Sequence, residues 1–194
     1  MSFVSRLSCQ LRVGDRLSVL ARDAARKSGS TRRGPLAGII AVMTSPQIGA
    51  SARRTRTVTT RDIEAFTEIT GDRNPIHYDD EVAKSSRFGG IVVQGGVTTG
   101  LLNALVAEQL PGPGSVFLEV AWRFLAPVRP GDVITAEATV TGAREDKPVS
   151  TLATSITNQD GVTVLDGTAV VWRDPVVAER FSAEAIQADR SRPY

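Results

Sequence analysis

The stretch that decides the fold is "GGVTTGLLNALVAEQL", residues Gly95–Leu110. Its apolar residues do not keep to one stripe of a helix but occur almost all round it. They are Val97, Leu101, Leu102, Ala104, Leu105, Val106, Ala107 and Leu110. A helix of this kind is buried on most sides, and the Pro111-Gly112 pair that follows ends it. The sequence therefore predicts one central buried helix. Three glycines near its start indicate that another group approaches its backbone closely there.

On the C-terminal side of this helix, apolar and polar residues alternate, which predicts three or four long antiparallel strands. In "SVFLEVAWRFLAPV" (Ser115–Val128) the alternation places Leu118, Val120, Trp122 and Phe124 on one face. A second strand is expected in residues 133–143, and residues 149–173 form a hairpin around Asp160-Gly161, a common turn pair. One buried helix followed by such strands predicts an α+β fold in which an antiparallel sheet wraps around the helix.

On the N-terminal side, "TTRDIEAFTEITG" (Thr59–Gly71) predicts a short amphipathic helix. Acidic side chains in its first turn favour the positive end of the helix dipole, and Thr59 with Asp62 matches a capping box. Gly71 suits the left-handed position that ends a helix. Short strands are expected in residues 56–59 and 91–93.

Composition and charge exclude several classes of protein. The chain has 194 residues, one cysteine and one histidine, so an intramolecular disulfide framework is excluded and a Cys/His zinc site is disfavoured. Residues 1–42 carry eight of the 23 Lys/Arg residues and two of the 21 acidic ones, so they have a net charge of +6 while the remainder has −4. A mildly acidic remainder does not suit a nucleic-acid partner, and no apolar run approaches the roughly 20 residues of a membrane span.

We expect three parts: a basic leader in residues 1–52, one domain in residues 53–174, and a C-terminal tail in residues 175–194. The head, residues 1–42, is rich in Arg and Ser and poor in acids, which is also the composition of a mitochondrial targeting segment. The alternatives are an extension that precedes a start at Met43, a disordered arm, and a partner-binding helix. A cytoplasmic location is expected, with the mitochondrial matrix as the alternative if residues 1–42 are a transit peptide.

The only histidine lies in "TGDRNPIHYDD", residues Thr70–Asp80. Asp72 and His77 are separated by Asn74-Pro75, so they share a loop in which both side chains can point into one space. Such a pair can make a water molecule nucleophilic, because histidine can accept its proton and a carboxylate can orient it. Asp, Asn and Pro are also ordinary turn residues, and spacing alone favours that simpler explanation.

The whole pattern resembles a known family. "GDRNPIH", followed by "YDDEVAKSSRFGGIVVQGG" and later by "LPGPGSVFL", "PVRPGD" and "REDKPV", is similar to the MaoC-like (R)-specific enoyl-CoA hydratases. The resemblance covers about residues 55–173. It implies a hot dog fold and a homodimer, with Asp72 and His77 as the catalytic pair. It further implies that the backbone N–H of Gly95 binds the thioester oxygen of the substrate.

The sequence departs from that pattern at two positions. The family commonly has His immediately before this glycine, where this chain has Gln94, and a Ser of some members aligns with Asn103. We expect Gln94 and Asn103 to contact substrate, Asn74 to steady the loop, and Asp79 and Asp80 to begin a solvated helix.

The expected activity is hydration of a trans-2-enoyl thioester to the (R)-3-hydroxyacyl thioester, or the reverse dehydration, without cofactor or metal. The substrate carrier is CoA or acyl carrier protein. The alternatives are a hot dog acyl-CoA thioesterase, which usually needs a helix carboxylate where this helix has only Glu108, and a non-catalytic dehydratase subunit or binding module.

Overall fold

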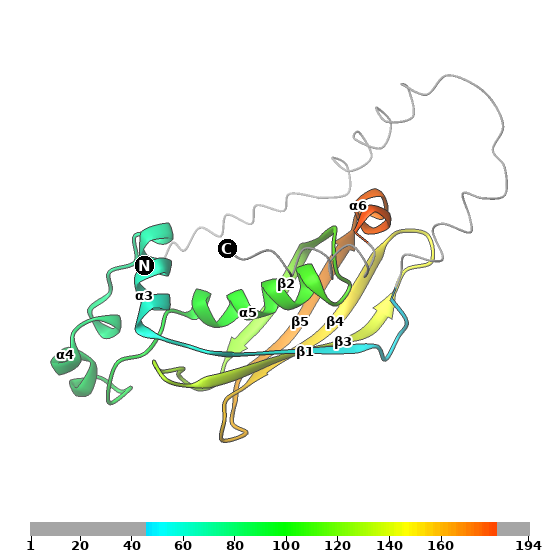
Figure 1. Ribbon diagram of the computed structural model, residues 1–194. Helices are drawn as coiled ribbons and strands as arrows, with labels where there is room; N and C mark the ends of the chain where they lie inside the picture. Colours follow the sequence, from blue (N-terminus) through cyan, green and yellow to red (C-terminus); the bar gives the residue numbers. More distant parts are fainter. Residues whose placement is uncertain (1–45, 182–194) are drawn as a thin grey trace, which may run out of the picture. The chain divides into compact units, whose positions relative to one another are not determined.

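The computed structural model describes residues 46–181, which contain five strands and five helical segments (Figure 1). The strands are β1 (Ser51–Thr57), β2 (Ser115–Phe124), β3 (Val133–Ala143), β4 (Val149–Thr157) and β5 (Thr163–Arg173). The helical segments are α3 (Thr60–Thr70), η1 (Pro75–His77), α4 (Asp80–Ser85), α5 (Gly95–Glu108) and α6 (Pro175–Arg180). The head, residues 1–42, and most of the expected tail lie outside the described residues.

The strands form one antiparallel sheet in the order β1-β3-β4-β5-β2, and α5 lies across one face of it (Figure 1). Leu102 and Leu105 of α5 have no exposed surface and pack with Ile134, Leu152 and other side chains of the sheet. This confirms the predicted antiparallel sheet around a buried central helix. Burial of this apolar surface is the main stabilising contribution to such a domain.

The predicted helix in residues 59–71 is confirmed as α3, together with its two ends. The Asp62 carboxylate accepts a hydrogen bond from the backbone N–H of Thr59 at 2.8 Å, as a capping box requires. Gly71 follows α3 with φ 75°, in the left-handed region that glycine tolerates best. The chain can therefore leave the helix abruptly and enter the loop that carries Asp72.

Three local predictions were wrong. The strand expected in residues 56–59 is β1, which begins at Ser51 inside the expected leader, because its polar residues pair with β3 without showing a clear alternation. Residues 91–93 form no strand and make only isolated backbone hydrogen bonds, such as Val93 N–H to Val128 O at 2.9 Å.

In β2, a bulge between Phe117 and Glu119 shifts the alternation. Phe117 rather than Leu118 therefore packs with Trp122, with their ring centroids 5.7 Å apart.

Within the described residues, no helix is both long enough and apolar enough to span a membrane.

The loop after α3 and the start of α5 meet at one end of the sheet. The α3 and α4 helices lie beside that end of α5 (Figure 1).

Candidate active site

The loop between α3 and α4 brings Asp72 and His77 together. Pro75 begins η1, and Asn74 precedes it with its side-chain oxygen accepting from the N–H of Ile76 at 3.4 Å. This short turn places His77 Nε2 3.7 Å from Asp72 Oδ2. The imidazole is 8% exposed and the carboxylate 40%, so the carboxylate lies on the solvent side of the pair.

A backbone contact fixes the tautomer of His77. Its Nδ1 lies 2.7 Å from the carbonyl oxygen of Val92, which can only accept a hydrogen bond. Nδ1 therefore carries a hydrogen, and in the neutral form of the ring Nε2 presents a lone pair to Asp72. Two acceptors that face each other at 3.7 Å do not bond directly, but one water molecule can donate to both.

The remaining polar atoms of Asp72 have partners. Its N–H donates to Thr70 Oγ1 at 3.2 Å, its carbonyl accepts from Thr67 Oγ1 at 2.7 Å, and Oδ1 accepts from the N–H of Asn74 at 3.1 Å. Oδ2, the oxygen that faces His77, has no hydrogen-bond partner among the described residues. The geometry leaves one carboxylate oxygen and one imidazole nitrogen available to a reactant.

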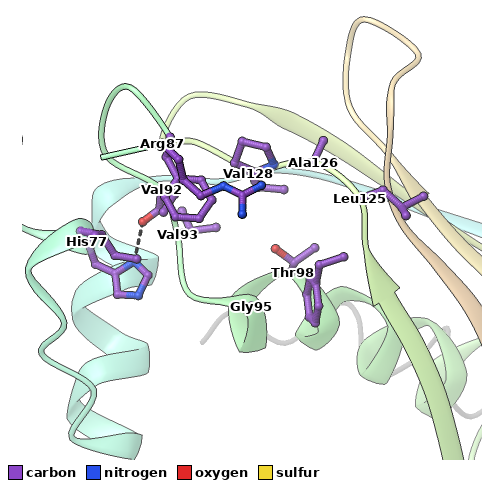
Figure 2. A pocket seen from close by; sticks show the side chains of 13 residues that line it. His77, Arg87, Val92, Val93, Gly95, Thr98, Leu125, Ala126 and Val128 are labelled. Carbon is purple, nitrogen blue, oxygen red and sulfur yellow. Dashed lines mark hydrogen bonds between the residues drawn. The ribbon is translucent and has the colours of Figure 1, made fainter. Parts of the chain in front are cut away.

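A cavity of about 500 Å³ adjoins His77 and reaches the N-terminal end of α5 (Figure 2). Its walls are mainly apolar, with Ile76, Val92, Val93 and Phe124 among them. The first N–H groups of any helix lack partners within that helix, and the helix dipole makes this end positive. The expected oxyanion donor, Gly95, is thus brought to the same cavity as His77.

Gly95 lies close to the ring of Phe124. A Cβ added to Gly95 would come within 3.0 Å of the Phe124 ring, so no larger residue fits without displacement of that ring. The neighbouring Gly96 is more tightly packed, because its added Cβ would lie 2.1 Å from Phe66 of α3. These contacts explain Gly95 and Gly96, because glycine otherwise disfavours a helix. The close approach expected at the third glycine, Gly100, is wrong, since an added Cβ there would meet nothing within 4 Å.

Two polar side chains on the cavity wall, Thr98 and Arg87, were not predicted from the sequence, and neither were its apolar residues. Thr98 lies one turn beyond Gly95 on the same side of α5 and is 3% exposed. Arg87 extends over the cavity from the loop after α4, with its guanidinium carbon 5.7 Å from the centre of the Phe88 ring (Figure 2). The spacing of Thr98 from Gly95 could have indicated its position, whereas nothing local identifies Arg87.

The other expected site residues are placed differently. Asn103 is exposed on α5 and does not line the cavity. Gln94 is 2% exposed, and its amide nitrogen points to α3 rather than forming part of the cavity wall. Asp79 caps α4 and Asp80 pairs with Lys84, which confirms that these two acids begin a solvated helix. In residues 46–181, no group of His, Cys, Asp or Glu side chains could hold a metal ion.

Comparisons with known proteins place the chain among enoyl-CoA hydratases and related dehydratases. The chain is 39% identical to the (R)-specific enoyl-CoA hydratase of Aeromonas caviae over 127 residues, which are 66% of this chain and 95% of that protein. It is 36% identical to the 3-hydroxybutyryl-CoA dehydratase of Methylorubrum extorquens over 125 residues, which are 64% of this chain and 79% of that protein.

Among solved structures, the (R)-hydratase of A. caviae involved in PHA biosynthesis matches with a TM-score of 0.64 and 38% identity. The match covers 67% of this chain and 98% of that one, and it confirms the hot dog fold. Residues 43–160 match the family model described as the MaoC like domain. The matched region includes the Asp72–His77 loop and all of α5, and the chain belongs to the MaoC-like domain family.

Proposed function

We propose that the protein is a hydro-lyase that adds water to trans-2-enoyl-CoA to give (R)-3-hydroxyacyl-CoA, and that also catalyses the reverse dehydration. The observation that carries this proposal is the 3.7 Å separation of two acceptors, Asp72 Oδ2 and His77 Nε2, with His77 on the wall of a mainly apolar cavity. A water molecule held by both acceptors has its own lone pair free to attack the substrate. The named activities of the relatives support the same reaction class.

In the proposed mechanism, the water oxygen bonds to C3 of the enoyl group while one of its protons passes to the Asp72/His77 pair. The C2=C3 electrons move toward the thioester, so negative charge develops on its carbonyl oxygen. The N–H of Gly95 at the positive end of α5 stabilises that charge, and a single donor of this kind is typically worth about 3 kcal/mol of barrier. The pair then returns its proton to C2, which completes the addition of one water molecule.

The cavity walls support an acyl thioester as substrate. Aliphatic and aromatic side chains, among them Ile76, Val92 and Leu125, can cover an acyl chain, while Thr98 adds a hydroxyl beside the start of α5. Arg87 is the permanently charged side chain on these walls, and it suits the phosphate groups carried by CoA and by the prosthetic arm of an acyl carrier protein. Both carriers belong to the proposal, and a comparison of kcat/KM for the same acyl group on each distinguishes them.

We also propose that the active form is a homodimer joined along β2. This strand is at one edge of the sheet, and it exposes four large apolar side chains. They are Val116, Leu118, Val120 and Phe124. A long apolar edge strand of this kind favours pairing with a second strand. Sedimentation equilibrium tests this. The wild type should be dimeric, and Val120→Lys, which places a charge on the proposed interface, should shift the equilibrium toward the monomer. A monomeric wild type would contradict the proposal.

For the location in the cell we propose the cytoplasm, with import into the mitochondrial matrix as the alternative. N-terminal sequencing of the mature protein distinguishes them, because cleavage within residues 1–42 would favour import.

The position of the only carboxylate on α5, that of Glu108, argues against the thioesterase alternative. Glu108 is at the C-terminal end of α5, where it pairs with Arg54, and it is not on the cavity wall. Thioesterase activity in this fold would need a carboxylate near the thioester. Hydrolysis of acyl-CoA by a protein inert to enoyl-CoA would reverse this preference.

The proposal is tested with crotonyl-CoA and longer enoyl-CoA substrates, by following the loss of absorbance of the conjugated thioester. Asp72→Asn and His77→Ala should each lower kcat by about 10²–10⁴-fold, the usual contribution of general acid–base catalysis. Asp79→Asn is the matched control, because Asn also caps helices well and Asp79 caps α4. The product should be oxidised by an (R)-specific and not by an (S)-specific 3-hydroxyacyl-CoA dehydrogenase. The assignment would be refuted if Asp79→Asn lost activity while Asp72→Asn and His77→Ala kept it. It would also be refuted if the product had the opposite stereochemistry.

A further inference from the structure

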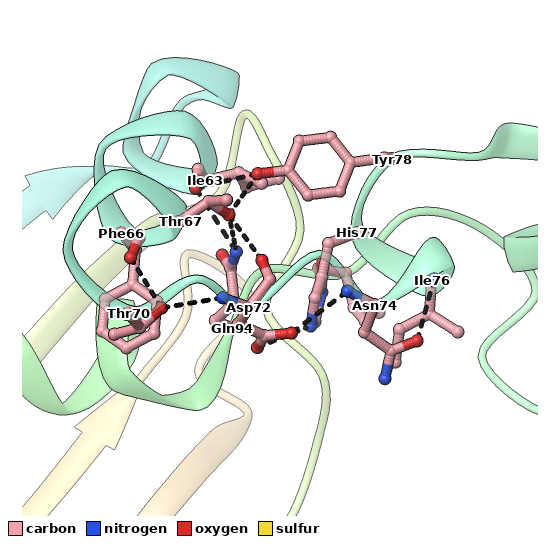
Figure 3. A network of polar contacts seen from close by, with 11 residues as sticks. Ile63, Phe66, Thr67, Thr70, Asp72, Asn74, Ile76, His77, Tyr78 and Gln94 are labelled. Carbon is pink, nitrogen blue, oxygen red and sulfur yellow. Dashed lines mark hydrogen bonds and ion pairs between the residues drawn. The ribbon is translucent and has the colours of Figure 1, made fainter.

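A buried polar network connects the start of α5, through α3, to the loop between α3 and α4 that carries Asp72 and His77, which we call the catalytic loop (Figure 3). Gln94, the residue before α5, donates from Nε2 to Thr67 Oγ1 at 3.0 Å and to the carbonyl oxygen of Ile63 at 3.3 Å. Thr67 is 5% exposed and Gln94 is 2% exposed. Tyr78, from the other end of the catalytic loop, also bonds to the Thr67 hydroxyl.

The direction of each hydrogen bond at Thr67 follows from its chemistry. The hydroxyl has one hydrogen, and the carbonyl oxygen of Asp72, 2.7 Å away, can only accept it. The other two partners then donate to the lone pairs of Thr67: Gln94 through its amide N–H, and Tyr78 through its hydroxyl. The Tyr78 hydroxyl also lies 3.4 Å from the carbonyl oxygen of Ile63, which is the more distant of its two acceptors. Every hydrogen-bonding position of Thr67 is then occupied, and its hydrogen has only one direction available.

The orientation of the Gln94 amide is constrained by the same argument. Its nitrogen must face Thr67, since an oxygen in that place would repel the Thr67 lone pairs. Oε1 is left buried without a hydrogen-bond partner among the described residues. A buried unpaired acceptor costs free energy of folding, so a residue chosen for stability alone would be apolar here. The amide is thus better explained by what its nitrogen does.

We propose that Gln94 and Thr67 are positioning residues for Asp72. Gln94 directs the Thr67 hydrogen to the Asp72 carbonyl, which fixes the peptide group next to the catalytic carboxylate. Together with the bonds from Asp72 N–H to Thr70 and from Asn74 N–H to Oδ1, this keeps Oδ2 at its 3.7 Å separation from His77 Nε2. The inference rests on the proposed hydratase function and adds to it a residue pair that does not touch the substrate.

The kinetic test uses variants of nearly unchanged shape. Thr67→Val removes the hydroxyl, and it should lower kcat by about 10- to 100-fold with KM changed less than about threefold, because small misplacements of catalytic groups are costly. Thr67→Ser restores the hydroxyl and should recover most of the activity. Gln94→Glu replaces the donor by an acceptor and should lower kcat similarly. The double variant should be no worse than Thr67→Val alone, because Gln94 acts through Thr67.

Thr154→Val is the matched control. Thr154 is also a 5% exposed threonine, and it accepts a hydrogen bond from Trp122 Nε1 at 3.1 Å. This variant should lose thermal stability but keep the wild-type kcat. A kcat loss in Thr154→Val equal to that in Thr67→Val would overturn the proposal, as would wild-type kcat in Thr67→Val.

A second readout does not depend on activity. His77 is the only histidine, so the imidazole nitrogen signals of the untagged, ¹⁵N-labelled protein report on this one ring. Thr67→Val and Gln94→Glu should shift them, because Asp72 moves relative to Nε2, whereas Thr154→Val should not. Unshifted signals in both variants would overturn the positioning role. A wild type inert to all enoyl thioesters would instead refute the proposed function, while these signals continued to test the positioning.

Discussion

Gly96→Ala tests the close packing between α5 and α3. The added Cβ would lie 2.1 Å from Cζ of Phe66. Carbon atoms in contact are normally about 3.5–4.0 Å apart, so the ring or the whole of α3 must move by about 1.5 Å. At Gly100, on the same helix, an added Cβ would meet nothing within 4 Å. Gly100→Ala is therefore the matched control for the change in helix propensity.

The two variants should differ in stability by the cost of overpacking alone. Replacement of Gly by Ala inside a helix gains about 0.8–1.0 kcal/mol, and this gain is common to both. Forcing a methyl group into a packed site costs about 1–3 kcal/mol, and only Gly96→Ala incurs this cost. Gly100→Ala should thus be stabilised by up to about 1 kcal/mol, whereas Gly96→Ala should lie about 1–3 kcal/mol below it.

Urea unfolding followed by tryptophan fluorescence measures both free energies of unfolding, at one protein concentration so that any association affects the variants equally. The kcat of Gly96→Ala should also fall, by up to about 100-fold, because Thr67 follows Phe66 in α3 and its hydroxyl contacts Asp72. In the Phe66→Ala background the cost of Gly96→Ala should disappear, since the obstructing ring is absent. Equal stability of Gly96→Ala and Gly100→Ala would refute the packing argument.

Three further outcomes are expected. Gly95→Ala should raise KM and lower kcat for enoyl-CoA, because its Cβ would come within 3.0 Å of the Phe124 ring at the proposed oxyanion donor; an unchanged kcat/KM would contradict this. Asn103→Ala should leave kcat/KM within about twofold, since Asn103 is exposed outside the cavity and exposed positions seldom matter; a large loss would restore it to the site. Asp174→Ala should destabilise the domain by about 0.5–2 kcal/mol in thermal unfolding, because its carboxylate caps α6; an unchanged midpoint would refute the capping role.

The local sequence was sufficient for the elements whose signals are contained within a few residues. The helix α5 was predictable because apolar residues on nearly every side require burial, and the end of α3 because Gly71 suits a left-handed conformation. The alternation along β3 and β4 likewise indicated a sheet with one face against the helix. The Asp72–His77 pair was recognised through the motif around it, since its spacing alone also fitted an ordinary turn.

Contacts between residues far apart in the chain were decided only by the tertiary structure. The tautomer of His77 depends on a carbonyl 15 residues away, and the role of Gln94 depends on Thr67, 27 residues before it. Phe124 reaches Gly95 because β2 is placed beside the start of α5 by its pairing with β5. The sequence alone determined which segments had to be buried, and its motif assigned the proposed reactive groups to one loop. Which atoms face one another depends on how the buried elements pack, and local propensity contains no information about that packing.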